Sequence, residues 1–161
     1  MYSEINMKLL RQSHVKYGLL MSGITVICIL CMHLTGQYNN LQEKSPFELI
    51  FITVTPLVVW YFGIKARKQE LKRKITYKQA FMEGVKISSV YAITSPFVFL
   101  AYYTFINPNL MDFMRKEYGL QDASDQMVIA FDMFVQFAAA MIGGTAYGAL
   151  LSLFLKTKSK H

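Results

Sequence analysis

Two cysteines and a histidine lie close together in the first apolar stretch of the chain and could support thiol chemistry. Cys28 and Cys31 are three residues apart, so a helix would place both on one face, and His33 follows two residues later. Such a pair can exchange thiols or, with the histidine, hold a metal. Apolar surroundings disfavour the thiolate, however, and the chain has no second cysteine pair to relay electrons. We therefore expect two ordinary buried cysteines and keep thiol–quinone redox chemistry at Cys28 and Cys31 as an alternative.

Two carboxylates, Asp132 and Glu83, lie beside long apolar segments. A carboxylate in the bilayer core is costly, which would make Asp132 a candidate for a proton or cation relay. Counting about 20 residues back from the C-terminal lysines places the outer boundary of the last span near Gln136, so Asp132 is expected as a solvated charge outside the core. Glu83 can pair with Lys86 at the other interface. The polar path of a transporter or channel component would consist of Asp132, Gln136, Glu83 and Lys86.

A stripe of small residues in the last apolar segment could bring helix backbones close together. Its members recur every four residues and are Ala140, Gly144, Gly148 and Ser152. Gly144 and Gly148 form the Gly-x-x-x-Gly motif of closely packed membrane helices. The partner of this helix-packing face could be another helix of the same chain, a second subunit or a partner protein, and the sequence leaves these occupants open. Isoleucine in place of either glycine is expected to disrupt the assembly.

The elements that must position these residues are four long segments without charge. They run from Tyr17 to Gln42, Leu49 to Ile64, Ile87 to Met111 and Met133 to Leu155, in a chain of 161 residues with only 17% charged side chains. A bilayer core of about 30 Å needs roughly 20 helical residues. We therefore predict an all-α fold, an integral membrane four-helix bundle that forms a single domain over residues 1–161. The spans are expected at about 17–36, 45–64, 87–106 and 133–155.

Local signals mark the starts of two spans. Ser45 and Glu48 enclose a proline in a capping box before the second span, and Thr76 and Gln79 form another before the third. Short amphipathic stretches flank the spans, and we expect interfacial helices at about residues 3–13 and 108–117.

Basic residues are concentrated on one side of the predicted spans. Three precede the first span, seven lie between the second and third, and three follow the last, against three in the two other loops together. The positive-inside rule then places both termini and the central loop in the cytoplasm. That loop is also dense enough to contact anionic lipids, through Lys65, Arg67, Lys68, Lys72, Arg73, Lys74 and Lys78. Because the net charge of +7 lies beside apolar segments, we expect no nucleic-acid binding.

Short motifs along the chain are similar to those of one membrane family. They are Lys16-Tyr17-Gly18-Leu19 with Gly23, Phe62-Gly63-Ile64-Lys65, Ile75-Thr76-Tyr77, Ala80-Phe81, Gly84, Ile87-Ser88, Tyr91 and Ser152-Leu153. In these motifs the chain resembles the bacterial family catalogued as domain of unknown function 4199. Here Lys72-Arg73-Lys74 replaces the glycines usual before the Ile-Thr pair, and the segment between the last two helices is short. The resemblance implies four helices in a bacterial inner membrane and supplies no activity or catalytic residue.

The function expected from these features is non-enzymatic. The sequence has no phosphate-binding glycine loop, no metal-ligand spacing and no nucleophile elbow, so we expect no catalytic residue, cofactor or metal. The leading hypothesis is a small inner-membrane protein that acts by helix–helix association, as an accessory subunit or a homo-oligomer. Its partners would be the bilayer with its anionic lipids and a second copy or another membrane protein. A small transporter or channel component and a thiol–quinone redox protein are the alternatives.

Overall fold

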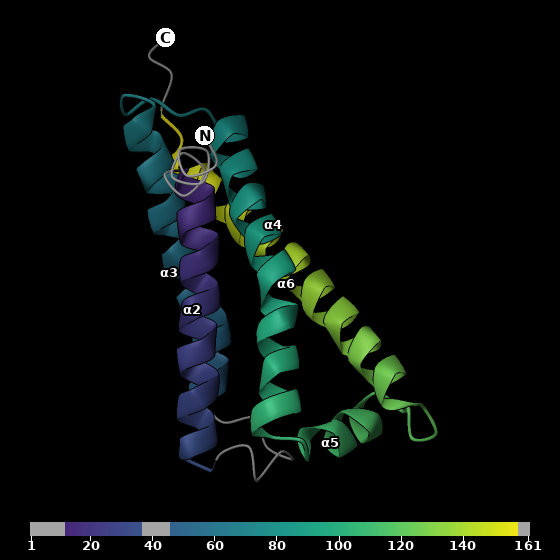
Figure 1. Ribbon diagram of the computed structural model, residues 1–161. Helices are drawn as coiled ribbons and strands as arrows, with labels where there is room; N and C mark the ends of the chain where they lie inside the picture. The colour runs from purple at the N-terminus through teal and green to yellow at the C-terminus, as the bar shows by residue number, and fades with distance from the viewer. Residues whose placement is uncertain (1–11, 37–45, 158–161) are drawn as a thin grey trace, which may run out of the picture.

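A computed structural model describes residues 12–36 and 46–157, apart from the side chains of residues 47 and 48. All regular structure in these two ranges is helical, and the elements are α2 (Ser13–Leu34), α3 (Pro46–Glu70), α4 (Tyr77–Ala101), the π-helical η2 (Tyr102–Ile106), α5 (Leu110–Glu117) and α6 (Asp125–Leu155). Four helical stretches are long and apolar enough to cross a bilayer: α2, Leu49–Glu70, Tyr77–Ile106 and α6. The predicted all-α membrane bundle of four helices is confirmed (Figure 1).

The bundle has two unlike ends (Figure 1). At one end, the start of α2 and the end of α6 lie near the turn that joins α3 to α4; we call this the basic end, because the turn contains Lys72, Arg73 and Lys74. Here α6 crosses α4, and from the crossing it slants away toward its own first residue. At the other end, α5 runs across the gap between the lower ends of α4 and α6, and we call this the α5 end.

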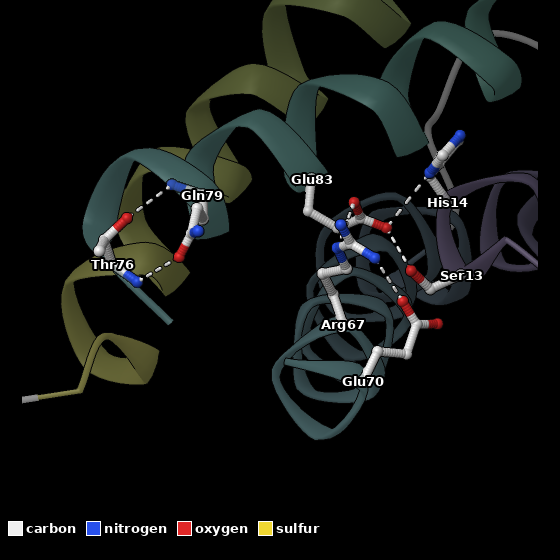
Figure 2. Close-up of polar contacts among 7 residues, drawn as sticks. All are labelled: Ser13, His14, Arg67, Glu70, Thr76, Gln79 and Glu83. Atoms are coloured by element: carbon white, nitrogen blue, oxygen red, sulfur yellow. Dashed lines mark hydrogen bonds and ion pairs between the residues drawn. The ribbon is translucent and has the colours of Figure 1, made fainter. Parts of the chain in front are cut away.

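Side-chain caps fix the starts of two long helices. The capping box predicted for α4 is confirmed: the Gln79 backbone N–H donates to the Thr76 hydroxyl at 3.2 Å, and the Thr76 N–H donates to the Gln79 side-chain carbonyl at 3.0 Å (Figure 2). The Met127 N–H donates to the Ser124 hydroxyl at 3.4 Å before α6. The capping box expected at Ser45 and almost all of the interfacial helix expected at 3–13 lie outside the described residues.

All four long helices extend beyond the expected spans. α2 begins at Ser13, α3 continues to Glu70, α4 begins at Tyr77 and α6 begins at Asp125. Hydropathy sets only the length of helix that a bilayer covers, whereas backbone hydrogen bonds continue through polar turns until a cap or turn ends them. α5 occupies most of the range where the second interfacial helix was expected, and it buries Leu110 and Met114.

A π-helical turn ends the third span. The Asn107 N–H donates to the Tyr102 carbonyl at 2.9 Å, five residues back instead of four. The wider turn lets two consecutive tyrosines, Tyr102 and Tyr103, both be buried. They belong to a core cluster with Ile29 and Val128 at the α5 end, while Trp60 and Ile64 belong to a separate cluster toward the basic end.

Candidate functional site

The α4–α6 crossing brings two glycines into contact. A β-carbon added to Gly84 would lie only 2.7 Å from the Cα of Gly148, and one added to Gly148 would lie 3.2 Å from the Cα of Gly84. One added to Gly144 would collide with the Ser88 side chain and lie 2.9 Å from Cζ2 of Trp60. The glycines of the predicted packing face therefore face α4 and α3 of the same chain, and only small residues permit this approach.

The two other residues of the packing face, Ser152 and Ala140, have different surroundings. Ser152 is buried, and its hydroxyl donates to the Gly148 carbonyl at 2.6 Å. Ala140 is half-buried and faces a cavity. The four residues of the stripe therefore do not all contact a helix.

Trp60, the single tryptophan of the chain, is buried just below this crossing. Its indole N–H donates to the Ser88 hydroxyl at 3.1 Å, and that hydroxyl donates to the Gly84 carbonyl at 2.9 Å. Because both side-chain donors are paired, the polar atoms can be buried between α3 and α4. Together, the two hydrogen bonds and the glycine contacts pack α3, α4 and α6 closely against one another at this level of the bundle.

Glu83 places a carboxylate at the basic end, where its side chain is only 3% exposed. Figure 2 shows the carboxylate between α2 and α3: Oε1 accepts a hydrogen bond from the Ser13 hydroxyl and lies 3.4 Å from Nδ1 of His14. Oε2 lies 3.9 Å from Nε of Arg67, which also donates from Nη1 to Glu70 at 2.6 Å. One buried carboxylate thus joins the first turn of α2 and the last turns of α3 to α4.

The predicted pairing of Glu83 with Lys86 is wrong for the described part of the chain. Lys86 is exposed and makes no ion pair with Glu83 there, because the glutamate faces the interior and the lysine faces outward. A buried carboxylate needs partners that reach the interior too, and Ser13 and Arg67 do so from the neighbouring helices.

Asp132 occupies the equivalent position at the α5 end, with a side chain that is 2% exposed. Its Oδ1 accepts a hydrogen bond from the Tyr118 hydroxyl at 2.8 Å, and its Oδ2 accepts one from the Tyr103 hydroxyl at 3.3 Å. Burial raises the pKa of Tyr118, and its hydrogen bond to the Asp132 carboxylate raises it further. The prediction that Asp132 is a solvated charge is therefore wrong, because the segment after α5 folds back and covers it.

A cavity of about 400 Å³ lies between the glycine crossing and the α5 end, and all four spans line it. Its lining includes the buried Thr25 from α2, Trp60 from α3 and Ser95 from α4, and the half-buried Tyr91 from α4. Gln136 and Ala140 of α6 complete the lining, together with Gly143, where an added β-carbon would meet no atom within 4 Å. The cavity thus begins where the close contact of α6 with its neighbours ends.

The four residues of the predicted polar path do not converge on this cavity. Gln136 lines it, and Asp132 lies one turn farther along α6, bonded to the two tyrosines. Glu83 lies on the far side of the glycine crossing, and Lys86 is exposed. Sequence reasoning missed Thr25, Tyr91 and Ser95 as lining residues, because isolated hydroxyl residues in an apolar helix carry no recognisable spacing.

The two cysteines face different surroundings. Cys28 is buried and lines the cavity, with its thiol 3.9 Å from the sulfur of Met32. Cys31 is exposed on the outside of the bundle, so the expectation of two buried cysteines is correct for Cys28 alone. Nδ1 of His33 and the Tyr102 hydroxyl form a hydrogen bond of 3.0 Å. Across the described ranges, no group of three His, Cys, Asp or Glu side chains could hold a metal ion.

The turn between α3 and α4 holds basic residues in an unusual conformation. Lys72 and Arg73 have φ angles of 53° and 65°, in the left-handed region that favours glycine. The Arg73 N–H donates to the Lys68 carbonyl at 2.8 Å and closes the end of α3.

Two of the seven basic residues expected to contact lipid are engaged inside the chain. Arg67 pairs with Glu70, and the Lys68 ammonium donates to the Leu155 carbonyl at 2.7 Å at the end of α6. The other five are exposed, and they are Lys65, Lys72, Arg73, Lys74 and Lys78.

Comparison with known proteins gives a family but no activity. No curated protein and no solved structure was found to match the chain. A family described as "Protein of unknown function (DUF4199)" matches residues 16–157, which include the glycine crossing, both buried carboxylates and the cavity. The resemblance seen in the sequence motifs is thus confirmed, and the chain belongs to this family of membrane-spanning proteins of unknown function.

Proposed function

We propose that this protein is a non-enzymatic component of the bacterial inner membrane that holds a small molecule within its bundle, as part of a small transporter or carrier. The cavity among the four spans supports this function. Its volume of about 400 Å³ is in the range of small-molecule sites, and its lining combines aromatic side chains with a few polar ones, among them Gln136 and Tyr91.

The state of the buried acids supports a binding role over a catalytic one. Glu83 and Asp132 are both bonded to side chains of their own chain, and neither lines the cavity. A general acid or base must reach the reacting atoms. The thiols give little support to the redox alternative, because Cys28 faces the cavity and Cys31 faces outward.

Filling the cavity provides the test. Ala140→Phe places a ring in the lining of the cavity, while Ala146→Phe places the same ring on the exposed face of the same helix as a matched control. Mass spectrometry of protein extracted gently from its own membrane should find a small molecule bound to the wild type and to Ala146→Phe, but not to Ala140→Phe. Equal occupancy in all three proteins, or an empty wild type, would contradict the proposal.

The second candidate is association as an accessory subunit or homo-oligomer, now through a different surface. The glycine face of α6 is occupied by α4, yet α6 buries only 17% of its apolar stretch, against 39% for α2. Its outer face exposes Phe134, Phe137 and Phe154, which lipid or a partner helix would cover. Native mass spectrometry of the same preparation reports subunit number, and a monomer that retains its bound molecule would exclude this candidate.

Charge supports an orientation with the basic end in the cytoplasm. The five exposed cations of the last turns of α3, the α3–α4 turn and the start of α4 would then face the anionic lipids of the inner leaflet, and both termini would be cytoplasmic. An alkaline phosphatase fused to the C-terminus is accordingly expected to be inactive, because that enzyme needs the oxidising periplasm. An active fusion would reverse the orientation and remove the basis for contact with the inner leaflet.

A further inference from the structure

The exposed residues that line the cavity lie on α3 and α6, on the outer surface of the bundle. Ile52 of α3 and Ala139 of α6 both line it and both lie on the surface of the bundle, Ile52 with 52% of its side chain exposed. Toward the basic end, the Trp60–Ser88 hydrogen bond and the contacts of Gly144 close the bundle. A molecule dissolved in the bilayer therefore reaches the cavity from the side, without passing the charged residues at the basic end.

One buried hydroxyl in the wall of the cavity has no hydrogen-bond partner among the described residues. Ser95 is 1% exposed and lines the cavity, and its hydroxyl has no hydrogen-bond partner among the described residues. Two other hydroxyls that line the cavity, those of Thr25 and Tyr91, pair with each other at 3.2 Å. Other serines of α4 bond to the carbonyl four residues back, as Ser89 does to Val85 at 2.9 Å. A buried hydroxyl is normally paired, above all inside a bilayer.

We propose that the cavity binds a lipid-soluble molecule with a mainly apolar body and one carbonyl or hydroxyl oxygen, which enters between α3 and α6 and hydrogen-bonds to Ser95. This assignment rests on the proposed binding function and names its ligand class. A plain acyl chain would fill the space but leave the Ser95 hydroxyl unpaired. A charged solute would meet aromatic and aliphatic walls, with neither Glu83 nor Asp132 lining the cavity to compensate its charge.

Trp60 supplies the reporter, because it is the only tryptophan and lines the cavity. Bromine quenches tryptophan fluorescence on contact, so the probes are bromodecane and the matched alcohol bromodecanol, compared at equal membrane concentration in lipid nanodiscs. Bromodecanol should quench wild-type Trp60 saturably, with a half-saturating concentration about fivefold lower than that of bromodecane, the effect of one buried hydrogen bond. Ser95→Ala should abolish this difference, and Ser89→Ala, whose hydroxyl does not line the cavity, should preserve it.

The outcomes separate the ligand class from the binding function. Equal half-saturation of the two probes in the wild type, or a preference that persists in Ser95→Ala, would overturn the assignment of an oxygen-bearing ligand to Ser95. Saturable quenching that disappears in Ala140→Phe would still support binding in the cavity in that case. Quenching by both probes that never saturates, or is the same in wild type and Ala140→Phe, would overturn the proposed function itself.

Discussion

Two neighbouring glycines on α6 have opposite surroundings, and they mark the division between the two halves of the bundle. Gly144 is packed against Ser88 and Trp60, and one turn later Gly148 meets the backbone of Gly84. Gly143, by contrast, has open space where a side chain would be, although it and Gly144 both line the cavity. The same residue type therefore permits close contact at Gly144, where other helices are within reach, and leaves space unfilled at Gly143.

Different contacts stabilise the two halves of the bundle. In the basic half, contacts tie helix ends directly to each other: Glu83 reaches α2 and α3, and the backbone N–H of Thr157 donates to the Ile75 carbonyl at 2.8 Å. In the other half α6 slants away, and α5 lies across the gap (Figure 1). There Asp132 accepts hydrogen bonds from Tyr103 of η2 and from Tyr118, the residue that follows α5. One half is closed by direct contact between helices, and in the other α5, which we call the spacer, lies between the ends of α4 and α6.

The largest effect is expected at the crossing itself. Gly84→Ala would place a methyl group 2.7 Å from the Gly148 backbone, which cannot move aside as a side chain can, and should destabilise the fold by about 3 kcal/mol. Gly143→Ala is the matched control: its methyl meets nothing, and alanine should stabilise the helix by up to about 1 kcal/mol. Unfolding in mixed micelles with increasing dodecyl sulfate measures both changes. Similar losses in the two variants would refute the contrast between the closed and the open half.

Local sequence signals were sufficient for the helices but not for what lies between them. Hydropathy, the Thr76 cap and the small-residue spacing indicate four spans and a packing face on the last one. Glu83 and Ser13 are 70 positions apart, and no local pattern connects them. The burial of Asp132 was missed because depth counted along one helix ignores a neighbouring segment, here around Tyr118, that folds over it. The cavity depends on the slant of α6, which no residue type encodes alone.

The turn between α3 and α4 has a backbone conformation that residue propensity alone would not predict. Lys72 and Arg73, at which the sequence motifs led us to expect a departure from glycine, both adopt positive φ. This conformation costs a non-glycine residue roughly 1 kcal/mol, because its β-carbon approaches the following carbonyl oxygen. The φ angles could not be read from the sequence, because the turn geometry depends on how α3 and α4 pack.

A smaller effect is expected at the α5 end, where removing one carboxylate tests whether the spacer holds the open half apart. Asp132→Leu leaves the hydroxyls of Tyr103 and Tyr118 without their acceptor and should destabilise the fold by about 2 kcal/mol. Asp122→Leu removes an exposed carboxylate from the preceding loop and should change stability by less than about 0.5 kcal/mol.

The coupling between Asp132 and Tyr118 separates a lost hydrogen bond from a general effect of the substitution. Tyr118→Phe alone should cost about 1 kcal/mol, and adding it to Asp132→Leu should cost less than the sum of the two single changes, because the shared hydrogen bond is already gone. The same micelle unfolding measures all three proteins. Full additivity would mean that the two residues act independently, and the covered carboxylate would then not hold the segment after α5 against α6.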